Sequence, residues 1–334
     1  IEITFLITIN LLFSITSIFW IIFQKPPTKK QKLCLDKIKI ALHSVLSDSL
    51  AKPVEVCKVW VAKILDRQKT SHIVVSLADK LPVIELKHLK RATCKNGHIY
   101  VILDLMEKFK DQIQLREKMR KFNLTGLDEN YELVDVPFTR PITRKQYNAA
   151  RHLWAINFHE DKYLEKQVNN CVFTDQEIML FTDIMETAIT VASECSLLDG
   201  YPIGAVIFDP ISKIIVGKGC DYRRKHPLKH AAMVAIDDVA RQQVLYQKEN
   251  KNKKSSQYLC TGYYAFLTRE PCLMCSMGLL HSRIKKVFFG KTSPSGALET
   301  TVKLHTRDGL NHHFEVYSGL LRDRIAQELE SYSV

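Results

Sequence analysis

The sequence has no disulfide framework. Its nine cysteines are an odd number, and they lack the close, regular spacing of a disulfide-rich secreted domain. We therefore expect reduced thiols, as in the cytosol or the nucleus. The chain also lacks an acidic excess, because 48 lysines and arginines oppose 36 aspartates and glutamates and give a formal charge of +12. A basic balance suits the phosphates of a nucleic acid, although many soluble proteins are mildly basic.

The length and composition indicate two domains. The chain has 334 residues, of which 46% are hydrophobic, and this is enough for more than one core. Two prolines and two arginines between residues 137 and 144 mark a junction. We therefore predict an α+β domain at 33–137, a linker with a helix at 138–172, and an α/β domain at 173–334.

A pair of cysteines directly after a proline is the most informative motif. Cys272 and Cys275 follow Pro271, which can begin a helix because its missing N–H is not needed in the first turn. Both thiols would then lie on that turn, where the helix dipole favours thiolates. His230, 42 residues upstream of Cys272 (272 − 230), opens another helical apolar pattern. Two thiolates and one imidazole make a three-ligand Zn²⁺ site with one position left over.

Two other interpretations of this motif are open. A C-x-x-C pair inside a cell can be a redox pair, or two thiols of the core. Pro271 and His230 favour zinc over both. Zinc-dependent nucleobase deaminases have the signature H-x-E…P-C-x-x-C, in which the glutamate moves protons between the water, the ring and the leaving ammonia.

The glutamate of that signature is missing. Its position, two residues after His230, is occupied by Ala232, which has no group for acid–base catalysis. Glu270 lies beside the cysteines, but in deaminases that this chain resembles the acidic residue before Pro-Cys is separate from the proton shuttle. The sequence therefore predicts a zinc site at His230, Cys272 and Cys275, with no catalytic residue.

Several stretches resemble the non-catalytic subunit of the eukaryotic tRNA-specific adenosine deaminase. They are residues 258–263, 268–275, 281–284 and 311–314, with 158–161 before them. The resemblance covers about the last half of the chain and little of the first 130 residues. It implies a cytidine-deaminase-like fold, a catalytic deaminase subunit as heterodimer partner, and tRNA as substrate. Together the two subunits would convert the wobble adenosine-34 to inosine, in the nucleus and the cytoplasm.

The order of elements agrees with that fold. Thr174 and Glu177 form a possible capping box before a helix that runs to about Ser193. The following order is strand, strand, helix, strand, helix, strand, which predicts a three-layer α/β/α sandwich. Both zinc-bearing helices would start at the same edge of the sheet.

The first domain shows a different order. We predict strands at 54–62 and 131–136, helices at 70–78 and 108–121, and a hairpin of 83–94 with 98–105 around Asn96-Gly97. This order matches a ferredoxin-like split βαβ. Its basic residues would contact RNA phosphates or form a solvated face: they are Lys87, Lys90, Arg91, Lys95, Lys108, Lys110, Arg116, Lys118, Arg120 and Lys121.

The remaining histidines and the chain end offer weaker candidates. We expect His159, His312 and His313 to serve packing or docking rather than metal ligation. The fourth zinc ligand would be water or the carboxylate of Val334. Two rival functions stay open: an active deaminase with another proton shuttle, and a non-enzymatic RNA-binding module.

The first residues pose a separate question. There is no initiator methionine, and the apolar stretch from Ile1 to Phe23 is long enough to span a bilayer. Lysines follow it, up to Lys32, and would keep the rest of the chain on the cytoplasmic side. The segment could be an anchor, a targeting segment, or translated sequence upstream of the true start. We favour the last, because nothing in the resembling family requires a membrane.

Overall fold

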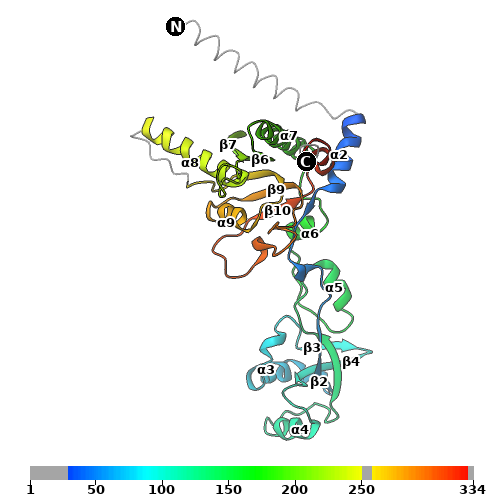
Figure 1. Ribbon diagram of the computed structural model, residues 1–334. Coiled ribbons are helices and arrows are strands. Elements are labelled where there is room, and N and C mark those ends of the chain that lie inside the picture. The colour runs from blue at the N-terminus through cyan, green and yellow to red at the C-terminus, as the bar shows by residue number, and fades with distance from the viewer. Residues whose placement is uncertain (1–28, 250–257, 330–334) are drawn as a thin grey trace. The chain divides into compact units, whose positions relative to one another are not determined.

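The computed structural model describes residues 29–249 and 258–329, and the chain divides into two compact units (Figure 1). The first unit combines Ile1–Ser47 with Gln167–Val334, and the second is Asp48–Lys166. Within the described part of the chain, no helix is long and apolar enough to cross a membrane. The apolar start of the sequence and Val334 lie outside the described residues, so what we expect of them stays a prediction.

The first unit is built on a six-stranded sheet with the order β1-β10-β9-β8-β6-β7. The central strands β10, β9 and β8 run parallel, whereas β1, β6 and β7 pair in the antiparallel sense. The strands are β1 (His43–Ser44), β6 (Tyr201–Asp209), β7 (Ile214–Asp221), β8 (Tyr264–Arg269), β9 (Lys286–Lys291) and β10 (Glu315–Ser318).

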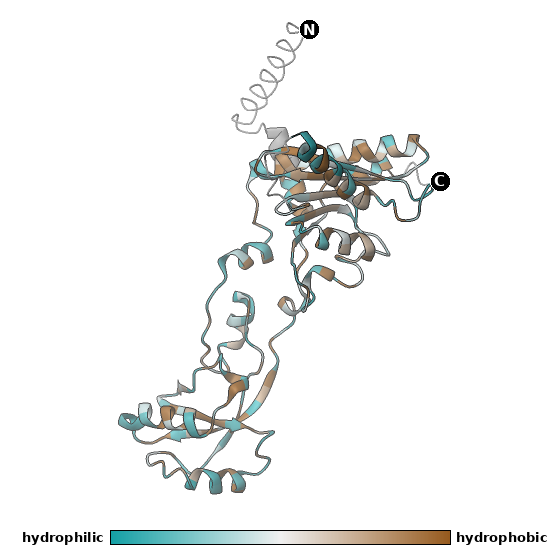
Figure 2. Cartoon of the chain, turned by 90° about the vertical axis from the view of Figure 1, so that its left-hand side faces the viewer, coloured by the Kyte–Doolittle hydropathy of each residue, from teal (hydrophilic) through white to brown (hydrophobic). Residues whose placement is uncertain are grey.

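Helices cover both faces of this sheet. One face carries α2 (Lys29–Ala41), α7 (Asp175–Leu197) and α10 (Arg322–Leu329). The other carries α8 (Ala231–Glu249) and α9 (Leu273–His281). The result is a three-layer α/β/α sandwich, which confirms the predicted fold. In Figure 2 the strands between these helices are mostly brown, the colour of apolar residues.

The α7 face of the sheet has an aromatic core. The rings of Phe266 and Phe288, on neighbouring strands, stack at 4.7 Å, and Tyr317 continues the stack at 5.0 Å from Phe288. Phe181 of α7 packs on Phe288 at 4.8 Å. Side chains alternate between the two faces of a strand, so every second residue of β8 and β9 enters this layer. The helix begins with the predicted capping box at Thr174.

A glycine lets helix α8 lie close to the sheet. A Cβ on Gly219 of β7 would lie 2.0 Å from the carbonyl oxygen of Ala231, at the first turn of α8. No side chain can be accommodated at that distance. The glycine therefore fixes how near the start of α8, and with it His230, comes to the sheet.

The second unit has a four-stranded antiparallel sheet with the order β3-β4-β2-β5. This order and the two crossover helices are those of a ferredoxin-like split βαβ, as predicted. Asn96 and Gly97, both with positive φ, form the predicted hairpin turn between β3 and β4. The elements are β2 (Val56–Ile64), α3 (Thr70–Lys80), β3 (Ala92–Lys95), β4 (His98–Leu105), α4 (Gln112–Arg120) and β5 (Glu132–Pro137).

Both faces of this smaller sheet are covered. Helices α3 and α4 pack on one face. The other face packs against Trp154 and against α5 (Arg144–Ala150). Trp154 is 1% exposed, and its indole N–H donates to the carbonyl of Lys90 at 2.7 Å. The flat face of the sheet is therefore not open to an RNA strand.

The unit boundaries differ from the predicted ones. We expected a first domain at 33–137 and a linker at 138–172. The structure instead packs Leu35 and Ile38 of α2 into the core of the first unit, and β1 pairs with β10. It also places most of the expected linker in the second unit, and α6 (Lys162–Val168) lies at its end. Local composition cannot show that a short helix packs on a sheet formed by residues far along the chain.

One pair of cysteines is oxidised in the structure. Cys195 of α7 and Cys220 of β7 form a disulfide, with 5.6 Å between their Cα atoms. The expectation that all thiols are reduced is wrong for this pair. The two residues are 25 apart in the sequence and become neighbours only because α7 packs beside β7.

Candidate metal centre

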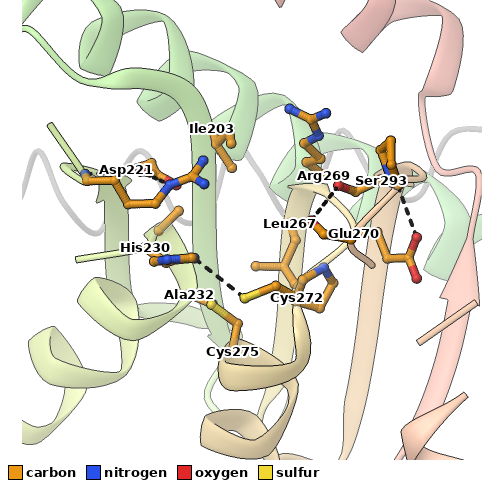
Figure 3. A pocket seen from close by; sticks show the side chains of 15 residues that line it. Ile203, Asp221, His230, Ala232, Leu267, Arg269, Glu270, Cys272, Cys275 and Ser293 are labelled. Carbon is orange, nitrogen blue, oxygen red and sulfur yellow. Dashed lines mark hydrogen bonds and ion pairs between the residues drawn. The ribbon is translucent and has the colours of Figure 1, made fainter. Parts of the chain in front are cut away.

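Three residues from two helix starts converge at one edge of the larger sheet. His230 directly precedes α8, Cys272 is the N-cap of α9, and Cys275 lies in its first turn. Their ligand atoms all lie within 4.8 Å of one another. The Sγ atom of Cys272 is 3.6 Å from Nδ1 of His230 (Figure 3). The structure thus brings together the three residues that the spacing predicted.

The sheet topology explains this convergence. Strand β8 ends at Arg269, and the chain then reaches Cys272 within three residues. The carbonyl of Pro271 accepts hydrogen bonds from the amide of Ala297 at 2.9 Å and from the hydroxyl of Ser276 at 3.3 Å. These bonds fix the turn between the strand and the helix, so the first turn of α9 faces the start of α8.

The three residues lie in a cavity of about 340 Å³. Cys275 is buried, whereas His230 and Cys272 are partly exposed to the cavity. The lining also includes polar and charged side chains from the surrounding loops: Asp221, Arg223, Arg269, Glu270, Ser293 and Ser295. No motif of the sequence had indicated Asp221, Arg223 or the serines, and Arg269 had appeared only within the stretch 268–275.

The two thiols differ in acidity. The pKa of Cys272 falls to about 5, first because Cys275 donates a hydrogen bond to it, and further because His230 is near. The same hydrogen bond and burial raise the pKa of Cys275. The metal-free pair is thus one thiolate and one thiol. A metal ion would displace the remaining proton, since cysteine binds metals as the thiolate.

The donor set fits zinc. An imidazole nitrogen and two thiolates are ligands that Zn²⁺ takes in tetrahedral sites, and a third thiolate or histidine would make a closed site. No further histidine or cysteine joins this group among the residues that the structure describes. Three protein ligands with one position left is the donor count of catalytic zinc sites.

The position of the proton-transferring glutamate in the deaminase signature is occupied by an alanine. Ala232 lies in the first turn of α8, is 4% exposed and lines the cavity. Only two lining residues are acidic, Asp221 and Glu270. Either one would have to replace the missing glutamate, so the contacts of each decide whether the site has a proton shuttle.

Both carboxylate oxygens of Glu270 accept hydrogen bonds from the loop that follows β9. Its Oε1 accepts from the amides of Leu298, Glu299 and Thr300 at 3.0, 2.7 and 3.0 Å. Its Oε2 accepts from the amide of Ser293 at 3.0 Å and from the Thr300 hydroxyl at 2.5 Å. Figure 3 shows the carboxylate on the Ser293 side of the chain, away from His230. Glu270 therefore anchors a loop and has no free lone pair for a substrate proton.

Asp221 is also engaged. It is 2% exposed, and its two oxygens accept from Nε of Arg223 at 2.9 and 3.0 Å. Both of its oxygens are therefore held by the guanidinium of Arg223. Neither acidic residue of the cavity is thus placed as a proton shuttle.

The other histidines considered as ligands lie elsewhere. The ring of His312 bonds the carbonyl of Ile284 at 2.7 Å, and that of His313 bonds the carbonyl of His305 at 3.1 Å. Both therefore serve packing, as expected. His159 belongs to the second unit and is exposed.

Known proteins are similar to this chain. Residues 181–291 match the family model described as the cytidine and deoxycytidylate deaminase zinc-binding region. A "probable inactive tRNA-specific adenosine deaminase-like protein 3" of Danio rerio is 33% identical over 305 residues, with 83% of this chain and 90% of the relative covered. Its namesake in Homo sapiens is 32% identical, with 84% and 89% covered.

A fungal relative is also similar. The "tRNA-specific adenosine deaminase subunit tad3" of Schizosaccharomyces pombe is 32% identical over 190 residues, with 56% of this chain and 59% of the relative covered. The vertebrate relatives match at this identity over nearly their whole length. The chain therefore belongs to the family of the tRNA-specific adenosine deaminase-like protein 3.

Proposed function

We propose that this chain is the non-catalytic subunit of a tRNA adenosine deaminase that converts the wobble adenosine-34 to inosine. Its partner would be a catalytic homologue that supplies the missing glutamate. The observation that carries the proposal is Ala232, which lines the cavity of the candidate metal centre, where neither lining carboxylate is free. The names of the relatives, "probable inactive" in vertebrates and "subunit" in S. pombe, support the same role.

We propose that His230, Cys272 and Cys275 hold a structural zinc ion. The ion would fasten the start of α8 to the first turn of α9, which holds two layers of the sandwich in register. The fourth ligand would be water or the carboxylate of Val334. The zinc-binding region of the matching family model supports zinc in the family.

We propose tRNA as the nucleic-acid partner, bound by basic residues of the second unit and of the deaminase-like unit. In the second unit, Lys95 is engaged in packing, since its Nζ donates to the carbonyl of Leu153 at 2.5 Å. Arg91 donates from Nη2 to the carbonyls of Leu81 and Leu103. These two residues are therefore poor candidates for phosphate contacts. We propose the nucleus and the cytoplasm as the location, where tRNA is processed and used.

The test is deaminase activity on a tRNA with adenosine at position 34. This chain alone, the catalytic homologue alone, and the co-purified pair are compared under one condition. We expect inosine only from the pair, because each chain alone lacks either the proton shuttle or its partner. A pair in which the catalytic homologue has lost its glutamate is the matched control and should be inactive.

Two results would support the rival functions instead. Inosine formed by this chain alone would mean an active deaminase with another proton shuttle. Failure to co-purify with any catalytic homologue, while tRNA still binds, would indicate an RNA-binding module without enzymatic assembly.

A further inference from the structure

We infer that a basic and aromatic surface beside the cavity binds a single-stranded segment of RNA. We call it the Tyr201 surface, and it consists of Tyr201, Tyr222, Arg223, Arg224 and Lys225. The inference rests on the proposed function, which supplies tRNA as the partner. It deepens that proposal by naming where the deaminase-like unit contacts the RNA.

Cations lie over the aromatic rings of this surface. The Cζ atoms of Arg223 and Arg224 are 4.8 and 5.0 Å from the ring centre of Tyr201. The Nζ atom of Lys225 is 5.3 Å from the ring centre of Tyr222. A guanidinium that lies on a ring offers its outer plane to a nucleobase, and exposed rings stack on bases directly. Tyr201 is 39% exposed, so this layer is accessible.

The positive charge of the surface is only partly neutralised. Asp221 accepts from the backbone amide and from Nε of Arg223. Among the described residues neither terminal nitrogen of Arg223 has a hydrogen-bond partner, so both are available for a phosphate. Arg224 pairs with Asp199 at 2.9 Å, but both side chains are at least half exposed, and such pairs are weak. Lys225 forms no ion pair with any residue that the structure describes. Phosphates would therefore compete successfully for these cations.

The loop that carries these residues is held in place by its own backbone. The amide of Tyr222 donates to the carbonyl of Lys229 at 2.8 Å, and the amide of His226 donates to the carbonyl of Tyr222 at 3.0 Å. Lys225 bonds the same Tyr222 carbonyl at 2.9 Å. The loop ends at His230, one of the three residues of the candidate metal centre. A preorganised loop loses little conformational entropy when it binds.

The surface continues into the cavity. Arg223 and Arg269 both line it, and Figure 3 shows Arg269 on the other side of the opening from Asp221. Arg269 is exposed and has no ion-pair partner within the described part of the chain. The two guanidinium groups flank the mouth, so a backbone that follows the surface meets positive charge on both sides.

A solvated charged face is the ordinary explanation of a basic cluster, and helix α4 shows what that looks like. There Arg120 pairs with the exposed Glu129, and Glu117 lies between the basic residues. In α4 one cation, Lys118, lies over the ring of Phe109 at 5.0 Å. The Tyr201 surface differs in that two guanidinium groups lie over one exposed ring and three consecutive basic residues, 223–225, lie in one turn. Exposed bases are needed for stacking, so the occupant is a single strand such as a tRNA loop rather than a duplex.

The experiment uses the complete chain co-purified with its catalytic homologue. The variants are Arg224→Glu with Lys225→Glu, and separately Tyr201→Ala. The matched control is Lys218→Glu with Lys248→Glu, which makes the same charge change at exposed lysines of the same unit. The dissociation constant for adenosine-34 tRNA is measured by fluorescence anisotropy at several salt concentrations, and thermal melting checks that every variant is folded.

We expect the charge-reversal variant to bind tRNA at least about tenfold more weakly than the wild type. The number of ions released on binding, taken from the salt dependence of the dissociation constant, should fall by roughly one to two. Tyr201→Ala should weaken binding about tenfold with the salt dependence nearly unchanged, because stacking releases few ions. The control should bind like the wild type. A single-stranded RNA oligonucleotide should displace the tRNA from the wild-type pair better than a duplex of equal length does.

Several outcomes would overturn the inference. One is a folded charge-reversal variant and a folded Tyr201→Ala variant that bind tRNA as the wild type does, in a pair that deaminates it. This result leaves the proposed function intact. Equal loss in the control would also overturn it, because the effect would then be one of net charge. A wild-type pair that neither binds nor deaminates tRNA would refute the proposed function and the inference with it.

Discussion

At the residue scale, position 232 separates this chain from a catalyst. The cavity, the histidine and the two cysteines of a zinc deaminase are all present, but Ala232 has no proton to give or take. The sequence alone left Glu270 as a possible substitute. The structure removes it, since five hydrogen bonds commit its carboxylate to the loop after β9.

Substitution of Glu270 tests this structural role. Glu270→Gln replaces one acceptor oxygen with an NH₂ group that faces the N–H donor of Ser293. One buried N–H donor is then left without an acceptor, and the remaining hydrogen bonds are no longer made to a charged carboxylate. The first unit should therefore be destabilised by about 2–3 kcal/mol. Thermal unfolding of the first unit measures the change. Glu194→Gln, at an exposed position of α7, is the control and should have no effect.

The opposite result would have a clear meaning. If Glu270→Gln melted like the wild type but abolished inosine formation by the pair, Glu270 would act in the chemistry rather than in the fold. The contacts of Ser293 and Thr300 argue against that outcome, because they are made to the same two oxygens that a proton would need.

At the scale of elements, one ion pair joins the short edge strand β1 to the loop that follows β9. Nε2 of His43 lies 2.9 Å from Oε1 of Glu299, which belongs to the loop held by Glu270. The hydrogen bond with Glu299 raises the pKa of His43 above 6.5, and the same bond lowers the pKa of Glu299 below 4.5. The strand and the loop are thus coupled through a titratable contact.

The pH dependence of this pair follows from the raised pKa of His43 and the lowered pKa of Glu299. The contribution of His43 is complete below pH 6.5 and is lost as the pH rises through its raised pKa. That of Glu299 is complete above pH 4.5 and is lost as the pH falls through its lowered pKa. The pair therefore stabilises most between about pH 4.5 and 6.5. Because both side chains are partly exposed, we expect at most about 1 kcal/mol.

The measurement compares melting temperatures of the wild type and Glu299→Gln. The difference should be about 2–4 °C near pH 5.5 and should shrink by pH 8.5. Burial lowers the pKa of His305, but both proteins contain this residue, so its contribution cancels in the difference. A difference that stays constant across this range would show that the pair is a neutral hydrogen bond.

At the scale of the whole molecule, the chain has two units with separate cores. The buried clusters of the first unit, which has the deaminase-like fold, share no residue with those of the second, ferredoxin-like unit. His230, Cys272 and Cys275 all belong to the first of these. Any free energy that zinc contributes should therefore stabilise one unit and not the other.

Removal of the metal tests this separation. After treatment with a chelator, hydrogen exchange should speed up in α8, α9 and the loop at Ser293, while Asp48–Lys166 should keep its protection. The melting transition of the deaminase-like unit should fall, and that of the second unit should not. Cys275→Ser should behave like the chelated wild type, whereas Cys260→Ala, at a buried cysteine outside the site, should still respond to the chelator. A parallel loss of protection in both units would mean that they unfold as one.

Much of the fold could be predicted from sequence because its signals are local. The order strand, strand, helix, strand, helix, strand was predicted correctly for β6 to β9, and Thr174 with Glu177 began α7 as expected. Asn96-Gly97 set the hairpin because positive φ at both positions suits only such residues. Helix α3 begins at Thr70, as predicted, but runs to Lys80 instead of ending at residue 78.

For the candidate site, the residue types that the chemistry requires could be identified from the order of residues along the chain. The C-x-x-C pair after Pro271, the upstream His230 and the alanine at position 232 are fixed by order and spacing along the chain. The sequence around Pro271 is enough to place both cysteines within one helical turn. The identity of residue 232 is enough to show that it carries no carboxylate. These residues therefore predicted a zinc site without catalysis before any fold was known.

Only the tertiary structure decided which distant residues meet. It placed α2 and β1 on a sheet made mostly by residues 201–318, and it joined Cys195 to Cys220. It surrounded Glu270 with four amides and a hydroxyl, and it set Arg223 and Arg224 around Tyr201. The physical reason is that packing, hydrogen bonding and ion pairing act through space. Which residues become contact partners depends on how the layers of the fold pack together, and a local sequence pattern does not contain that information.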